Sequence, residues 1–157
     1  MNLEKATLAA GCFWGIEETF RNTPGVTETR VGYTGGSLQD PSYHDVCSDT
    51  TGHAEVVEVT FDSDNIQYSD LLDIFWKSHN PTTLNRQGFD IGTQYRSAIF
   101  THTDAQEADA IKSRESEEAR NYQRGQIVTE IVQASTFWEA EEYHQKYLQK
   151  RGISHHC

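Results

Sequence analysis

A strand-to-helix turn is predicted at Ala9-Ala10-Gly11-Cys12-Phe13-Trp14-Gly15, the stretch around which the rest of the chain is organised. A short apolar run precedes it, and one buried helix face follows with 3-then-4 spacing at Phe13, Ile16 and Phe20. Cys12 is therefore expected at the start of a helix. Unpaired backbone N–H groups and the positive end of the helix dipole favour a thiolate there, which predicts a lowered pKa for the Cys12 thiol.

Cys12 also has a purely structural interpretation, because free cysteine is among the most buried residue types. In the functional interpretation, Gly11 lets a substrate approach the backbone closely. Phe13 and Trp14 then offer an aromatic wall for an apolar group beside the sulfur. This stretch alone leaves both interpretations open, so the rest of the chain has to decide between them.

The composition predicts one domain and excludes several classes of partner. A chain of 157 residues is long enough for one core, over residues 1–157, and too short for two. The excess of 24 acidic over 13 basic residues argues against nucleic acid and anionic lipid as partners. No apolar run has the length of a membrane span, and the N-terminus lacks the features of a signal peptide. We expect a cytoplasmic protein.

The cysteines stand far apart, at positions 12, 47 and 157. This spacing makes neither a disulfide scaffold nor a CxxC pair, so we expect resting thiols in a reducing compartment. Cys157 lies five residues beyond Gly152, a tether of at most about 17 Å, and is expected to reach another thiol. Cys47 is the competing partner, although an inert loop cysteine is the likelier interpretation. His155, His156 and Cys157 make only a weak metal site, and no metal is expected.

Strand and helix patterns alternate along the chain without repeats. The expected strands cover residues 26–33, 53–61, 94–102 and 127–134. The expected helices run from Cys12 to Asn22, from a Ser69 cap to Asn80, from Thr103 or Asp104 to Gly125, and from a Thr136 capping box to Gly152. The third helix carries a thin apolar stripe, at Ala105, Ala108 and Ile111. Two long irregular stretches remain, 37–52 and 82–92. The pattern predicts a two-layer α+β domain with a mixed sheet.

Glu55 is the candidate acid. Period-two alternation puts it on the same strand face as Val57 and Val59, where desolvation favours the neutral carboxyl and predicts a raised pKa. In the alternative interpretation Glu55 turns into water or pairs with a basic side chain. A thiolate together with a proton donor would suit attack on an atom whose leaving group departs protonated.

Three further candidates, Tyr43, Asp90 and Tyr95, lie in or beside the two irregular stretches. Each alone is more often a loop hydrogen-bonder or a sheet aromatic than a site residue. In the functional interpretation, the three side chains converge on one pocket with Cys12.

Five segments then occur in a fixed order along the chain. They are Gly11-Cys12-Phe13-Trp14-Gly15, Gly32-Tyr33-Thr34-Gly35-Gly36, Tyr43 with Val46-Cys47, Thr51-Gly52-His53-Ala54-Glu55, and Gln87-Gly88 with Asp90 and Gly92-Thr93-Gln94-Tyr95-Arg96-Ser97. These segments resemble the motifs of the peptide methionine sulfoxide reductases of type A, from about residue 6 to 148. The resemblance implies a ferredoxin-like α+β core wrapped in extra coil, with residues 153–157 as a mobile tail.

The resemblance also implies the chemistry. Cys12 would be the nucleophile, while Phe13 and Trp14 would hold the substrate methyl group. The residues implied to bind the sulfoxide oxygen are Tyr43, Glu55, Asp90 and Tyr95, with Glu55 giving the proton. The family reduces the S epimer of methionine sulfoxide, peptide-bound or free, and thioredoxin usually recycles it. Cys12 would become a sulfenic acid, a second thiol would form a disulfide with it, and no metal or organic cofactor is required.

Two departures from the family pattern stand out. Many relatives have Asn where this chain has Phe89, and many have a longer tail, whereas this chain stops at Cys157. The assignment of Cys157 as the resolving thiol therefore rests on reach and family habit. Two alternatives remain: a cysteine hydrolase with His53 or His144 as its base, and a non-catalytic thiol protein that binds a metal or a redox partner through its tail.

Overall fold

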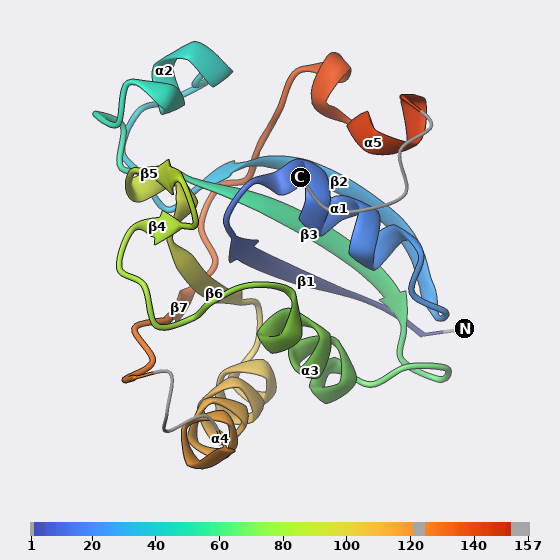
Figure 1. The fold of residues 1–157 in the computed structure, drawn as a ribbon. Helices are drawn as coiled ribbons and strands as arrows, with labels where there is room; N and C mark the ends of the chain where they lie inside the picture. Colours follow the sequence, from blue (N-terminus) through green and yellow to red (C-terminus); the bar gives the residue numbers. More distant parts are fainter. Residues whose placement is uncertain (1, 121–124, 152–157) are drawn as a thin grey trace.

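The computed structural model describes residues 2–120 and 125–151 and contains, within them, a six-stranded sheet in the order β7-β6-β1-β3-β2-β8 (Figure 1). The strands are β1 (Leu3–Ala10), β2 (Val26–Thr34), β3 (Ala54–Asp62), β6 (Ser97–Thr101), β7 (Glu130–Gln133) and β8 (Trp138–Glu139). All neighbours pair antiparallel except β6 and β7, which run parallel. The mixed sheet of the α+β prediction is confirmed.

The ferredoxin-like core is formed by the succession β1, α1, β2, β3, α3 and β6, whose strands lie side by side as β6-β1-β3-β2. The helices are α1 (Phe13–Arg21), α2 (Tyr43–Cys47), α3 (Tyr68–Ser78), α4 (Asp104–Arg120) and α5 (Tyr147–Lys150). The described residues also contain two single turns of 3-10 helix, η1 (Thr93–Tyr95) and η3 (Glu142–His144). A separate two-stranded hairpin consists of β4 (Arg86–Gln87) and β5 (Asp90–Ile91). No helix in the described ranges has the length and apolar character needed to cross a membrane.

The main core lies between the sheet and the two helices α1 and α3. Phe13, Ile16 and Phe20 of α1 and the apolar face of α3 join the inward side chains of the sheet in one buried cluster. A smaller cluster on the other face contains Ala9, Ala54, Val56, Ala98 and Phe100. Coil covers this second face, because Ala134 and Phe137 pack against it. The result is two layers with additional coil, as the sequence predicts.

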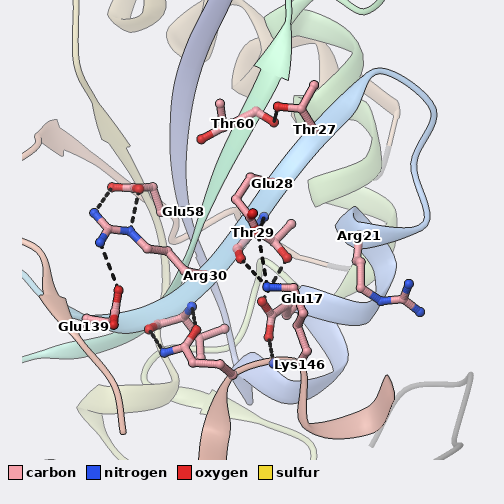
Figure 2. A network of polar contacts seen from close by, with 12 residues as sticks. Glu17, Arg21, Thr27, Glu28, Thr29, Arg30, Glu58, Thr60, Glu139 and Lys146 are labelled. Carbon is pink, nitrogen blue, oxygen red and sulfur yellow. Dashed lines mark hydrogen bonds and ion pairs between the residues drawn. The ribbon is translucent and has the colours of Figure 1, made fainter. Parts of the chain in front are cut away.

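The helix predicted after Thr136 is wrong. Residues 138–151, which we call the C-terminal strap, contain β8, η3 and α5 instead. Gln145 holds the strap against β2, because its Oε1 accepts the Val31 N–H at 2.8 Å and its Nε2 donates to the Val31 carbonyl at 2.9 Å. Lys146 follows with φ +53°, and its N–H donates to Glu17 at 2.6 Å (Figure 2). These non-local bonds outweigh the local helix signal.

Several boundaries also differ from prediction. The stretch 94–102 begins as the turn η1, and its strand starts only at Ser97. The helix α3 has its N-cap at Gln67, so Ser69 lies within the helix. The apolar stripe predicted on α4 is wrong: Ala105, Ala108 and Ile111 are exposed. The buried positions of α4 are Gln106, Ala110 and Glu117. Gln106 turns this face inward, since it bonds the Lys5 carbonyl and the His102 N–H.

Candidate active site

Cys12 lies where β1 passes into α1. Gly11 makes the turn with φ +92°, and a Cβ at this position would lie 2.8 Å from Gln87 Cγ, so only glycine fits. Cys12 itself is the N-cap of α1 and is partly exposed. The sulfur therefore sits at the positive end of a nine-residue helix and remains accessible to a substrate.

Glu55 meets Cys12 at the same helix end. The side chain is 1% exposed on β3, so the alternative in which it turns into water is wrong. Its Oε1 accepts a hydrogen bond from the Phe13 backbone N–H at 3.2 Å. Phe13 directly follows Cys12, so this bond fixes the carboxyl beside the first turn of α1.

Tyr43 and Tyr95 add two phenol groups to this neighbourhood. Desolvation raises the pKa of both hydroxyls, and the negative charge of Glu55 raises them further. The negative charges of Asp90 and Cys12 also raise the pKa of Tyr95. Both phenols therefore stay protonated at every physiological pH and serve as hydrogen-bond donors.

Asp90 lies in an exposed position on β5, close enough to Tyr95 for its charge to raise the pKa of that phenol. Asp90 and Cys12 line one cleft of about 230 Å³. The other lining residues are Ala10, Gly15, Ile16, Ser78, His79, Gln87 and Gly88. Of the polar side chains predicted for the site, the structure thus places Glu55, Tyr43 and Tyr95 in one electrostatic neighbourhood, and Asp90 at the open edge.

The two aromatic residues after Cys12 have different environments. Phe13 is buried, and its ring lies 5.7 Å from the ring of Tyr33 and 6.4 Å from that of Tyr43. Trp14 is partly exposed and stacks on Tyr147, with ring centroids 3.8 Å apart and planes inclined by 11°. Phe13 and Trp14 thus belong to one group of aromatic rings, which includes Tyr147 of the C-terminal strap.

His144 is a neighbour of the site that our sequence analysis considered only as a base. Its ring lies 4.4 Å from the Tyr43 ring and 5.2 Å from the Phe13 ring. Nδ1 accepts a hydrogen bond from Trp14 Nε1 at 2.9 Å, so the ring proton sits on Nε2. Burial lowers the pKa of His144 and keeps the ring neutral. The sequence predicted a continuous helix over this segment, so it did not indicate that His144 lies beside Trp14 and Tyr43.

Glu141 is a second residue that we missed. Its two carboxylate oxygens accept hydrogen bonds from the Tyr33 hydroxyl and the Tyr43 backbone N–H, both at 2.9 Å. It thereby joins the C-terminal strap to β2 and to the start of α2.

The short helix α2 lies within the stretch 37–52, which we expected to be irregular. Its sequence does contain a helix signal, because Ser42 and Asp45 form a capping box.

The histidines do not support a cysteine hydrolase. In His53, Nδ1 accepts the Gly36 N–H at 3.0 Å and Nε2 donates to the Leu38 carbonyl at 2.7 Å. In His144, Nδ1 is occupied by Trp14 and Nε2 carries the proton. Neither ring has a nitrogen available to take the proton of Cys12.

Cys47 and Cys157 differ in what the structure says of them. Cys47 is exposed at the end of α2, and desolvation raises the pKa of its thiol against the lowering effect of Tyr43. It therefore has less thiolate character than an ordinary cysteine. Cys157, together with the proposed tail 153–157 and its two histidines, lies outside the described residues. No group of three metal-ligating side chains occurs in 2–120 and 125–151.

A profile of the peptide methionine sulfoxide reductase family matches residues 4–157. The peptide methionine sulfoxide reductase MsrA of Methanothermobacter thermautotrophicus is 63% identical over 147 residues, which cover 94% of this chain and 87% of that protein. Mxr1 from Saccharomyces cerevisiae in reduced form matches with a TM-score of 0.91 and 37% identity, over 99% of this chain and 89% of that chain. Mxr1 in complex with Trx2 matches with a TM-score of 0.66 and 28% identity, over 92% of this chain and 84% of that chain.

Proposed function

Because the chain belongs to the peptide methionine sulfoxide reductase family, we propose that it reduces methionine S-sulfoxide, peptide-bound or free, with Cys12 as nucleophile and Glu55 as proton donor. One observation carries these roles. The hydrogen bond from Phe13 N–H to Glu55 Oε1 puts a buried carboxyl at the helix end where the partly exposed Cys12 lies.

The reaction begins with attack of the Cys12 thiolate on the sulfoxide sulfur. Glu55 protonates the oxygen as the sulfur–oxygen bond breaks, and this oxygen passes to Cys12. Methionine leaves, and Cys12 is oxidised to a sulfenic acid. The phenols of Tyr43 and Tyr95 donate hydrogen bonds to the sulfoxide oxygen, where negative charge develops. Phe13 and Trp14 hold the methyl group, and Asp90 binds at the open side.

Recycling requires a second thiol, and Cys157 is our candidate. The stack of Tyr147 on Trp14 places the end of the described chain beside the active-site helix. Residues 152–157 would span at most about 20 Å when extended, and we propose that this length lets Cys157 reach Cys12. Attack of this thiol on the sulfenic acid releases water and forms a disulfide. A thioredoxin then reduces the disulfide, as the complex of the relative Mxr1 with Trx2 supports.

The decisive experiment is a mass measurement of the reduced protein mixed with methionine sulfoxide in the absence of reductant. We expect one equivalent of methionine and one disulfide, mapped to Cys12 and Cys157. Cys12→Ser should form neither product. Cys157→Ser should complete one turnover and lose thioredoxin-dependent recycling, while Cys47→Ser should recycle normally. Recycling by Cys157→Ser but not by Cys47→Ser would replace our resolving thiol with Cys47.

Two further assignments, of the domain organisation and of the cellular location, belong to the same proposal. We treat residues 1–157 as one catalytic domain, which predicts a single cooperative unfolding transition in denaturant. We also place the protein in the cytoplasm, because a cycle that begins with reduced thiols suits a reducing compartment. Cell fractionation with detection of the protein tests this location.

A further inference from the structure

The hairpin β4–β5 exposes large apolar side chains beside the active site. Its strands pair Gln87 with Asp90, and the two-residue turn between them is Gly88 and Phe89. Phe89 at the tip is fully exposed, with a relative accessibility of 102%. Ile91 is 71% exposed and lies two residues further along. Leu84, at the other end of the hairpin, is also 71% exposed. Grouped apolar exposure of this kind marks interaction sites.

The hairpin is held firmly at its base. Gln87 bonds the backbone of Asn80 twice, with Oε1 accepting the N–H at 2.9 Å and Nε2 donating to the carbonyl at 2.6 Å. The Gly92 N–H donates to the Asn85 carbonyl at 2.9 Å and closes the other end. The Phe89 ring is therefore presented from a supported turn, which reduces the entropy lost when a partner packs against it.

Phe89 lies in the chain between two residues that line the Cys12 cleft. Gly88 and Asp90, the residues on either side of Phe89, both line that cleft together with Cys12. A cleft of about 230 Å³ is smaller than the roughly 300–1,000 Å³ of pockets that enclose a drug-sized ligand. It takes one side chain of a polypeptide, and the residues before and after that side chain remain at the rim.

We propose that Phe89, with Ile91 and Leu84, binds apolar side chains that flank methionine sulfoxide in an unfolded polypeptide, and that the enzyme therefore prefers such sites. The inference rests on the proposed function. In an extended substrate, side chains two residues apart point the same way at about 6–7 Å spacing, so a flanking side chain meets the rim while the sulfoxide is in the cleft. Oxidation of a core methionine disrupts packing and exposes apolar neighbours of this kind.

The test uses two blocked pentapeptides with a central methionine S-sulfoxide, one flanked by leucines and the other by serines. Dithiothreitol replaces thioredoxin, so protein reductant plays no part. For the unmodified chain we expect kcat/KM about 5-fold higher for the leucine peptide, chiefly through KM. Phe89→Asn should bring this ratio to about one, because asparagine suits a tight turn but offers no apolar surface. Phe89→Leu should keep most of the preference.

The matched control is Leu3→Thr. Leu3 is 55% exposed at the far end of β1 from Cys12, and threonine retains the preference for strand. This variant should keep the 5-fold ratio. An unchanged ratio in Phe89→Asn would overturn the inference, as would an equal loss on both peptides. If Phe89→Asn changed only the KM for thioredoxin, the Phe89 surface would bind the reductant and not the substrate. If the chain self-associated with concentration and Phe89→Asn abolished this, the surface would bind a second copy of the chain. Failure to reduce either peptide or free methionine sulfoxide would instead refute the proposed function.

Discussion

Two buried carboxyl groups lie at helix α1: Glu17 belongs to the helix itself, and Glu55 reaches its first turn from β3. Each is 1% exposed, yet their surroundings differ. Glu17 accepts hydrogen bonds from the Lys146 N–H at 2.6 Å and the Thr29 hydroxyl at 2.9 Å (Figure 2). Glu55 accepts one from the N–H of Phe13, the residue that follows the partly exposed Cys12. Burial alone thus identifies neither a catalytic nor a structural carboxyl. The groups around it decide, and Glu17 joins two parts of the fold.

Glu55→Gln tests this contrast with the largest expected effect. The amide oxygen still accepts the Phe13 N–H, but the side chain has no acidic proton, so single-turnover formation of methionine should fall about 10²- to 10⁴-fold. Quenched-flow measurement of methionine, with thermal unfolding alongside, separates the two properties. Glu17→Gln is the matched control and should stay within about threefold of the unmodified chain. Equal losses in both variants would erase the distinction.

Glu17→Ala should destabilise the fold. Removal of this carboxyl leaves the Lys146 N–H and the Thr29 hydroxyl without their buried partner, which costs about 2–3 kcal/mol. Urea unfolding measures the change in free energy of unfolding. Single-turnover chemistry under conditions where the variant is folded should fall far less than in Glu55→Gln. A stability equal to that of the unmodified chain would show that the strap does not depend on Glu17.

Tyr147→Leu should have a smaller effect. It keeps an apolar side chain at this position but removes the stack on Trp14, worth about 0.5–1.5 kcal/mol. Combined with Glu17→Ala in a double-mutant cycle, it shows whether the two anchors of the strap act together. Strict additivity would contradict a single anchored unit.

The pH dependence of Glu17 is the smallest effect. Burial raises its pKa above the ordinary value, against the lowering hydrogen bonds of Lys146 and Thr29. The folded chain therefore holds this proton more tightly than the unfolded chain. The stabilisation is complete below the unfolded pKa, near 4.3, and is lost as pH rises through the folded value. Relative to the unmodified chain, Glu17→Gln should gain stability as pH rises from 4 to 7. A constant difference in urea unfolding across this range would contradict the raised pKa.

The catalytic end of α1 was more predictable than the strap for a physical reason. A local turn places Cys12, and strand periodicity places Glu55. Both patterns can be recognised from residues that are neighbours in the sequence. The strap is placed by Gln145 and Glu17, which bond partners 114 and 129 residues away. A capping pattern at Thr136 contains no information about such partners. For the same reason the sequence did not predict that His144 would lie against Trp14.

The position of Trp14 has one more consequence. Its indole stacks on Tyr147 and donates to His144, two residues along the chain from the reacting sulfur. Trp76, by contrast, is buried between α3 and α4, where its indole bonds Ser113. Fluorescence emission from Trp14 therefore reports on contact between the strap and α1, together with emission from Trp138, which belongs to the strap, and against the background from the buried Trp76. The enzyme carries its own optical probe, and stopped-flow spectroscopy can time its steps without a dye.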